Sequence, residues 1–433
     1  QMNRFSIFYA LIFCFFISSC TEQHKDTSTE KFQFATPAEV GMVSDSLVKI
    51  EKMVMDFVDA KKYPGAVTLI AKNGKIIYES EVGWSDSLRT EPYRKDHLFR
   101  LASMTKPIVS VAAMQLVEAG KIKLDDPVGN YISSFKKTEI LKSFNPLDSS
   151  WTSLPSFKTP TVRQLLTHTS GIAYGFMSPK VYGAMLAKNG IPDLNTFLPM
   201  TAKETMSKVG DIPLAFEPGT KWMYGLNTDV LGRVVEVASG EDLDDYIREK
   251  ITKPLGIKML DFYFNDSLSS KLTKAFMPTY TGGITQIPNV KQLFYIPNYP
   301  TEGAKTYHSG GGGMTGTARD YFLFCQAMLD NGNLHGATLL QPETAKLMHQ
   351  DQLDSLSFRP GLEFGFGFDI AKEHPRKPDG AYGWGGAFST IFWIDPVNDL
   401  IVIQLRQVLS SPFNNDINSK LEKIVYSALA DPK

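Results

Sequence analysis

Apolar residues recur every three or four positions in two segments near the ends of the chain, at 44–61 and 415–429. This is the spacing of a helix that buries one face, so we predict an amphipathic helix in each segment. A third segment, 103–119, is apolar on nearly all sides and is followed by Gly120. That pattern predicts a helix buried inside the protein, with the glycine ending it.

Strand patterns also lie near both ends of the chain. Residues 66–70 and 75–78 are mostly apolar or β-branched, and they flank Asn73-Gly74, a pair that favours a two-residue hairpin turn. Residues 381–393 and 400–406 are rich in β-branched and aromatic side chains, which is typical of strands. We therefore expect strands from both ends of the chain to share one sheet.

The middle of the chain, about residues 125–292, shows little strand pattern. Its clearest periodic segments, 228–238 and 243–251, have the spacing of helices. Together these patterns predict an α/β (α+β) fold, in which an antiparallel sheet flanked by helices is built from N- and C-terminal segments. We expect an all-helical lobe to be inserted between those segments.

The N-terminus has a pattern of its own. A short basic start precedes an apolar run over residues 5–17, which is shorter than the roughly 20 residues of a membrane-spanning helix and typical of a secretory signal. Small residues precede Cys20, as at a bacterial lipoprotein cleavage site. We expect a signal peptide over 1–19, a lipid on Cys20 that anchors an exported protein to a membrane of a bacterial envelope, and a tether over 20–36. The alternative is an ordinary signal peptide with a cysteine nearby by chance.

Composition excludes several classes of function. The 433 residues are 43% hydrophobic and 21% charged, with a formal net charge of −1 and scattered Lys and Arg, so we expect no nucleic-acid partner. Beyond Cys14 and Cys20 the chain has only Cys325, which lies in an apolar segment and is expected to be a buried core residue without a disulfide. The seven histidines are dispersed, and we assign neither a metal site nor a cofactor.

A Ser-x-x-Lys sequence occurs five times in the chain, so the motif alone says little. Ser103 and Lys106 differ from the others because they begin the predicted apolar helix, where Pro107 is tolerated in the first turn. Spacing of three puts both side chains on one helix face, the helix N-terminus favours an oxyanion, and lost solvation favours the uncharged, basic form of the lysine. The alternative is a capping serine beside a surface lysine.

Five segments, taken in order, resemble motifs of the serine β-lactamase and penicillin-binding-protein superfamily. They are residues 99–106, 161–171, 218–224, 309–314 and 384–387. Their order and separations match from about Pro37 onward, which implies a β-lactamase-like serine hydrolase domain over 37–430, with its helical lobe at about 125–292. The fold implied by the resemblance agrees with the fold predicted from the periodicity.

The resemblance also implies roles for individual residues. Ser103 would be the acylated nucleophile, Lys106 the base that takes its proton, and Tyr224 a second hydroxyl that relays a proton to the leaving group. The backbone N–H groups of Ser103 and Ala387 would form the oxyanion hole. The alternatives are that Tyr224 is an aromatic core residue and that Trp384-Gly385-Gly386 is only a tight strand end.

Two departures from the family pattern bear on the substrate. Where penicillin-active members carry Tyr-x-Asn or Ser-x-Asn, this chain has Tyr224-Gly225-Leu226, with Asn227 one place late. Where they carry Lys-Thr-Gly, it has Trp384-Gly385-Gly386, which we assign to substrate binding. Both changes remove polar recognition of a charged amide, because leucine cannot form a hydrogen bond and tryptophan is neutral. The chain thus resembles the carboxylesterase and acyltransferase branch of the class C-like group.

We therefore predict a serine hydrolase that acts through an acyl-enzyme on a small-molecule ester, by hydrolysis or acyl transfer. One alternative on the same scaffold is a β-lactamase or D-amino-acid or cell-wall peptidase acting on an amide. Another, of a different class, is a non-catalytic lipoprotein that binds a wall fragment or a partner.

Three further features of the sequence have no catalytic role in this interpretation. We expect His168 to be a structural hydrogen-bonding residue at a helix end rather than a triad base. The glycine run 310–313 is expected to form a tight turn beside the site, because it lacks the lysine and the strand–helix context of a phosphate loop. The segment 277–308 fits no motif, and it either shapes the mouth of the pocket or is a surface excursion.

Overall fold

A computed structural model describes residues 32–430. The predicted signal peptide (1–19), Cys20 and the tether as far as residue 31 lie outside the described residues. No helix in the described part of the chain is both long and apolar enough to cross a membrane.

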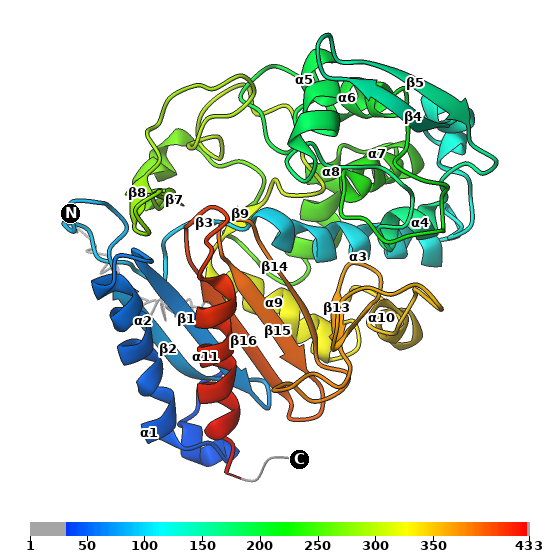
Figure 1. Cartoon of the computed structure of the whole chain (residues 1–433). Coiled ribbons are helices and arrows are strands. Elements are labelled where there is room, and N and C mark those ends of the chain that lie inside the picture. Colours follow the sequence, from blue (N-terminus) through cyan, green and yellow to red (C-terminus); the bar gives the residue numbers. More distant parts are fainter. Residues whose placement is uncertain (1–31, 431–433) are drawn as a thin grey trace, which may run out of the picture. The chain divides into compact units, whose positions relative to one another are not determined.

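A seven-stranded antiparallel sheet joins the two ends of the chain (Figure 1). Its strands, in spatial order, are β12 (Leu362–Phe364), β13 (Asp369–Ala371), β14 (Tyr382–Gly385), β15 (Ile391–Asp395), β16 (Leu400–Leu405), β1 (Gly65–Lys72) and β2 (Lys75–Gly83). Strands β1 and β16 pair directly, with Leu69 opposite Ile403. Positive φ angles of 52° at Asn73 and 73° at Gly74 form the predicted hairpin turn. The predicted antiparallel sheet flanked by helices is confirmed.

Helices cover both faces of this sheet. Helices α1 (Ser44–Leu47), α2 (Lys49–Asp59) and α11 (Asn414–Ser427) lie on one face, and α9 (Ala318–Leu329) packs against β1, β15 and β16 on the other (Figure 1). The apolar stripes predicted at both ends of the chain meet here, because Ile50, Val54 and Leu421 are fully buried in one core cluster. The first predicted helix is interrupted at Val48, which separates α1 from α2.

The predicted buried helix begins as a 3₁₀ turn, η2 (Ala102–Met104), and continues as α3 (Thr105–Glu118). Gly120, with a φ of 68°, follows its end, as predicted. Helix α3 packs against α7 (Asn227–Ser239) and α8 (Leu243–Ile247), whereas η2 contacts β14. The start of this helix therefore lies where the sheet meets the inserted lobe.

The inserted lobe is mainly helical, but the prediction that it is all-helical is wrong in detail. Besides α7 and α8 it contains α4 (Val162–Leu166), α5 (Ala184–Lys188), α6 (Ala202–Val209) and a hairpin of β4 (Glu139–Asn145) and β5 (Ser150–Pro155). Neither hairpin strand has a fully buried residue, so the alternation of apolar and polar positions that marks a half-buried strand is missing from the sequence.

Short elements complete the described chain. They are η1 (Pro37–Val40), β3 (Phe99–Arg100), η3 (Val128–Asn130), η4 (Ser133–Lys136), η5 (Pro179–Gly183), η6 (Arg248–Thr252), β6 (Leu260–Asp261), η7 (Asp266–Lys271), β7 (Phe276–Pro278), β8 (Ile284–Gln286), β9 (Thr315–Gly316), β10 (Asn333–Leu334), β11 (Ala337–Thr338) and α10 (Pro342–Met348).

The segment predicted as one strand over 381–393 is two strands, β14 and β15, joined by a turn. The turn brings the chain against the residues before α3. A Cβ on Gly386 would lie 2.2 Å from the carbonyl oxygen of Leu101, so only glycine permits this approach.

The joint core of α2, α11 and the sheet gives a stability prediction. Leu421→Ala should lower the free energy of unfolding by about 2–5 kcal/mol, because it leaves a cavity where a fully buried side chain packs. Lys423→Ala, on the exposed side of the same helix, should change it by less than about 0.5 kcal/mol. Urea unfolding measures both, and equal effects would show that α11 does not contribute to the core.

Candidate active site

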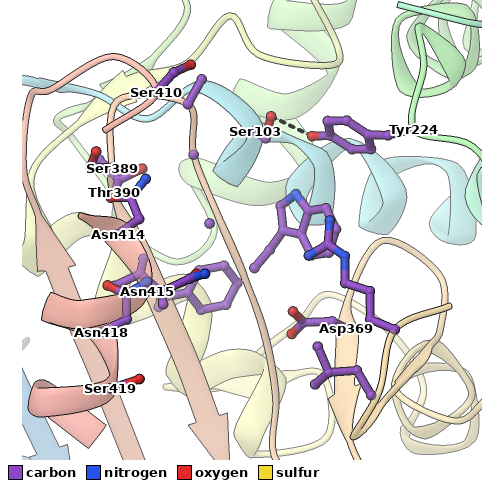
Figure 2. Close-up of a pocket in the computed structure, with 18 of the residues that line it drawn as sticks. Ser103, Tyr224, Asp369, Ser389, Thr390, Ser410, Asn414, Asn415, Asn418 and Ser419 are labelled. Atoms are coloured by element: carbon purple, nitrogen blue, oxygen red, sulfur yellow. Dashed lines mark hydrogen bonds between the residues drawn. The ribbon is translucent and has the colours of Figure 1, made fainter. Parts of the chain in front are cut away.

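A pocket of about 760 Å³ lies where η2, the loop before α7 and the end of β14 converge (Figure 2). It is lined by Ser103, by Tyr224 and by the segment from Trp384 to Ala387. Lys106 lies behind this surface and is only 1% exposed. The structure thus brings together every residue that the sequence predicted for the site, from three parts of the chain that are more than a hundred residues apart.

Ser103 Oγ lies between two polar groups. The Tyr224 hydroxyl donates a hydrogen bond to it at 2.6 Å, and Lys106 Nζ donates at 3.1 Å. The same ammonium lies 4.5 Å from the centroid of the Tyr224 ring. This geometry suits proton transfer among the three groups, because each donor is within hydrogen-bond reach of the hydroxyl oxygen.

Two further acceptors hold Lys106 in place. Its Nζ donates to the backbone oxygen of Gly311 at 2.6 Å and to the Tyr174 hydroxyl at 3.1 Å. With Ser103 Oγ, these account for the three N–H groups of the ammonium. The lysine side chain is therefore fixed in direction, although it lies in the core of the protein.

Asp229, on α7, binds the groups that hold Lys106 in place. Its carboxylate accepts hydrogen bonds from Ser309 Oγ at 2.6 Å, from the N–H of Gly311 at 3.1 Å and from the Tyr174 hydroxyl at 3.3 Å. Burial raises the pKa of the Asp229 carboxyl, and the charge of Lys106 opposes that shift. Burial, with the Asp229 carboxylate as the next cause, raises the pKa of Tyr174 well above its ordinary value.

Sequence reasoning missed Tyr174 and Asp229. Asp229 offered a signal, because it stands among apolar residues that the helical spacing of α7 predicts to be buried. A buried carboxylate needs partners, and those partners mark a polar centre. Tyr174 offered no comparable signal, since an aromatic residue in an apolar stretch is ordinary core material.

His168 is a structural residue here, in agreement with its predicted role. It is buried at the end of α4, and its Nδ1 is 3.0 Å from the side-chain nitrogen of Asn227. Its ring lies 4.9 Å from the Tyr224 ring, so it supports that side chain by packing. Burial first, and then the charge of Lys106, lower the pKa of His168 well below its ordinary value, which keeps the imidazole neutral.

The two departures from the family pattern have different structural consequences. Leu226 is fully buried, and Asn227 uses its amide to bind Ser170 and His168 rather than to reach the pocket. Trp384 does line the pocket, with its ring 5.7 Å from that of Tyr224. Its indole N–H is buried and has no hydrogen-bond partner among residues 32–430, a state that costs about 1–3 kcal/mol.

The structure also locates the other features considered in the sequence analysis. The glycine run 310–313 forms a turn beside the site, where Gly311 contributes both its N–H and its carbonyl oxygen. Part of the unassigned segment, 292–295, lines a second pocket next to the first. Cys325 is buried, as predicted, and burial raises the pKa of its thiol. Within the described residues, no three His, Cys, Asp or Glu side chains are grouped so that they could hold a metal ion.

Comparison with known proteins agrees with this arrangement. The model of the Beta-lactamase family matches residues 50–424. The chain belongs to the beta-lactamase family. This confirms the resemblance inferred from the five ordered motifs.

The chain is also similar to three individual proteins. Esterase EstB of Burkholderia gladioli is 29% identical over 387 residues, which cover 85% of this chain and 92% of EstB. Protein Rv1367c of Mycobacterium tuberculosis is 30% identical over 375 residues, covering 82% of this chain and 88% of that protein. The structure of EstCE1, a hydrolase with promiscuous acyltransferase activity, is 27% identical with a TM-score of 0.74, covering 88% of this chain and 99% of EstCE1.

The Lys106 environment yields a prediction at neighbouring glycines. A Cβ on Gly311 would lie 2.2 Å from Asp229 Oδ2 and 2.4 Å from the Tyr174 hydroxyl, whereas a Cβ on Gly312 would meet chiefly the flexible Leu194 side chain at 3.0 Å. Gly311→Ala should therefore lower the free energy of unfolding by about 1–3 kcal/mol, and Gly312→Ala by clearly less. Chemical denaturation of both variants checks this, and equal stabilities would contradict the packing described for Asp229 and Tyr174.

Proposed function

We propose that this protein is a serine hydrolase that forms an acyl-enzyme on Ser103 and acts on carboxylic esters, by hydrolysis or by acyl transfer to an alcohol. The observation that carries the proposal is the position of Ser103 Oγ between Lys106 Nζ and the Tyr224 hydroxyl. The similarity to esterase EstB and to EstCE1 supports the choice of esters.

In acylation Lys106 acts as the uncharged amine. Ser103 Oγ attacks the ester carbonyl carbon while its proton passes to Lys106 Nζ, which becomes an ammonium. The N–H groups of Ser103 and Ala387 stabilise the negative charge that develops on the carbonyl oxygen. The close approach of Gly386 to Leu101 supports this pairing, because it draws the turn that carries Ala387 toward the turn that carries Ser103.

In the next step the bond from the carbonyl carbon to the alcohol oxygen breaks. Tyr224 donates its proton to that oxygen and regains one from Lys106, whose ammonium lies 4.5 Å from the tyrosine ring. Deacylation repeats these transfers in the opposite direction, with water or a second alcohol as the attacking group. Water gives hydrolysis, and an alcohol gives acyl transfer.

The preference for esters rests on what the pocket offers. Trp384 stands where penicillin-active members have a lysine, so no cation awaits the carboxylate of a β-lactam or a peptide terminus at that position. Asn227 binds His168 and Ser170, and its amide is not available to a substrate amide. An ester with no charged amide side chain loses nothing from either change.

The test compares short-chain p-nitrophenyl esters with the β-lactam nitrocefin. We expect efficient ester turnover, slow or no nitrocefin turnover, and a loss of ester turnover of at least about a thousandfold in Ser103→Ala. Ser133→Ala is a matched control, because Ser133 begins another Ser-x-x-Lys sequence but is exposed in η4. It should keep full activity.

A fluorophosphonate probe separates the remaining outcomes. It should label the wild-type protein and not Ser103→Ala. Labelling together with inert esters and rapid nitrocefin or D-Ala-D-Ala peptide cleavage would replace the ester assignment with an amidase. Absence of labelling, with no turnover of any substrate, would favour a binding protein and overturn the enzyme proposal.

We also propose that the protein is exported and anchored to an envelope membrane by a lipid on Cys20. Support comes from the basic start, the short apolar run and the small residues before Cys20. Metabolic labelling with an alkynyl fatty acid in a bacterial host should mark the full chain and Cys14→Ser, but not Cys20→Ser. A wild-type protein that is secreted without label would show that the segment is an ordinary signal peptide.

A further inference from the structure

Two pockets of different chemistry meet beside Ser103. The larger, of about 760 Å³, contains Ser103 itself, and the second, of about 480 Å³, contains its neighbour Ala102. Both pockets are lined by Phe176, Leu194, Ala387 and Ser410, which therefore form the boundary between them. Both volumes are in the range of small-molecule sites.

The second pocket is mainly apolar. Its walls include Leu186, Ile191, Leu194, Phe294 and Phe388. It opens beside the proposed oxyanion-hole residue Ala387, so an apolar chain attached to the carbonyl carbon on Ser103 can enter it and be removed from water. This gives part of the unassigned segment a function as one wall of the pocket.

The larger pocket has a polar wall on its far side. Asn414, Asn415, Asn418 and Ser419 line it from one face of α11, which follows from their spacing of one, four and five residues. Figure 2 shows these side chains along one side of the pocket, with Ser103 and Tyr224 at its upper end and Asp369 opposite.

The side-chain oxygens of Asn414 and Asn418 accept hydrogen bonds from residues within the protein. The Tyr63 hydroxyl donates to Asn414 Oδ1 at 2.8 Å, and Arg406 Nη2 donates to Asn418 Oδ1 at 2.5 Å. Burial lowers the pKa of Arg406 to about 10, so it remains a cation at neutral pH. Because the oxygens are engaged, the amide nitrogens of Asn414 and Asn418 are the groups left to donate to a ligand.

The charged groups at this end are only partly paired with one another. Glu422 binds Arg376 at 2.6 Å and Lys377 at 3.3 Å, and Asp369 adds a second carboxylate. Arg359 is stacked on Phe358, 4.8 Å from its ring centroid, at the edge of the same pocket. A wall of amides and hydroxyls matches a ligand that carries many hydroxyl groups, and Trp384 lines the same pocket.

We infer that the ester has an apolar acyl chain, which occupies the second pocket, and a polyhydroxylated alcohol, such as a sugar or sugar alcohol, which lies against α11. This inference rests on the proposed ester hydrolysis. It assigns the two sides of the scissile bond to two pockets that share one boundary.

The test uses two ester series. In the first, the acyl group is always butyryl and the alcohol is either glucose or n-hexanol. In the second, the alcohol is always p-nitrophenol and the acyl chain is lengthened from acetyl to octanoyl. The wild-type protein should prefer the glucose ester to the hexyl ester in kcat/KM, and it should accept the longer acyl chains.

Variants should separate the two pockets. Asn414→Leu/Asn418→Leu should lower kcat/KM for the glucose ester about tenfold or more and leave the hexyl ester within about twofold. Asn415→Ala/Ser419→Ala is a milder pair for the same effect, should the leucine variant not fold. Leu186→Trp should reduce turnover of the octanoyl ester and spare the acetyl ester. Lys423→Leu, at an exposed position of α11 that does not line the pocket, should change none of these rates.

Each other outcome has a distinct meaning. An equal loss on the glucose and hexyl esters in the amide variants, or a wild-type preference for the hexyl ester, overturns the inference but leaves ester hydrolysis intact. If Asn414→Leu/Asn418→Leu instead alters the preference for acyl-chain length, the inference is also overturned. A wild-type protein that labels with fluorophosphonate but cleaves no ester refutes the proposed function itself.

Discussion

The site depends on a buried amine, Lys106, which becomes an ammonium each time it takes the proton of Ser103. An isolated charge in a protein interior is very costly, so it must be paired and fully hydrogen-bonded. Here the N–H groups are taken by Ser103, Tyr174 and the carbonyl oxygen of Gly311, and Asp229 supplies a carboxylate one hydrogen bond away through Tyr174. Any folded state of this chain that buries Lys106 must assemble these partners.

This requirement explains why segments far apart in sequence converge. The turn η2 carries Ser103 and helix α3 carries Lys106 to the junction, α7 brings Asp229, and the glycine turn brings Gly311. A side chain at Gly311 would overlap with both Asp229 and Tyr174, so only glycine fits at this point of the turn. The sheet supplies the remaining side of the pocket, because the turn after β14 can approach Leu101 only through Gly386.

The same constraint bears on substrate choice. With Trp384 in place of a second lysine, the lysine nearest the nucleophile is Lys106, whose amine is buried behind Ser103 rather than presented to the substrate. Recognition then passes to the walls, which are apolar around Leu194 and Phe388 and rich in amides along α11. Selectivity for a substrate would arise from the match of each half of an ester to its own wall.

The sequence predicted the sheet and its flanking helices from periodicity. Ordered motifs that resemble a known family pointed to Ser103, Lys106, Tyr224 and the Trp384 segment, because such motifs are local signals. The sequence did not reveal the hairpin β4–β5, whose strands bury too little to produce an alternating pattern. Nor did it reveal Tyr174, whose contact with Lys106 spans 68 residues and looks like ordinary core packing in the sequence. Only the tertiary structure decided these points and the division of the site into two pockets, because both depend on which side chains from distant segments meet, and that has no signature along the chain.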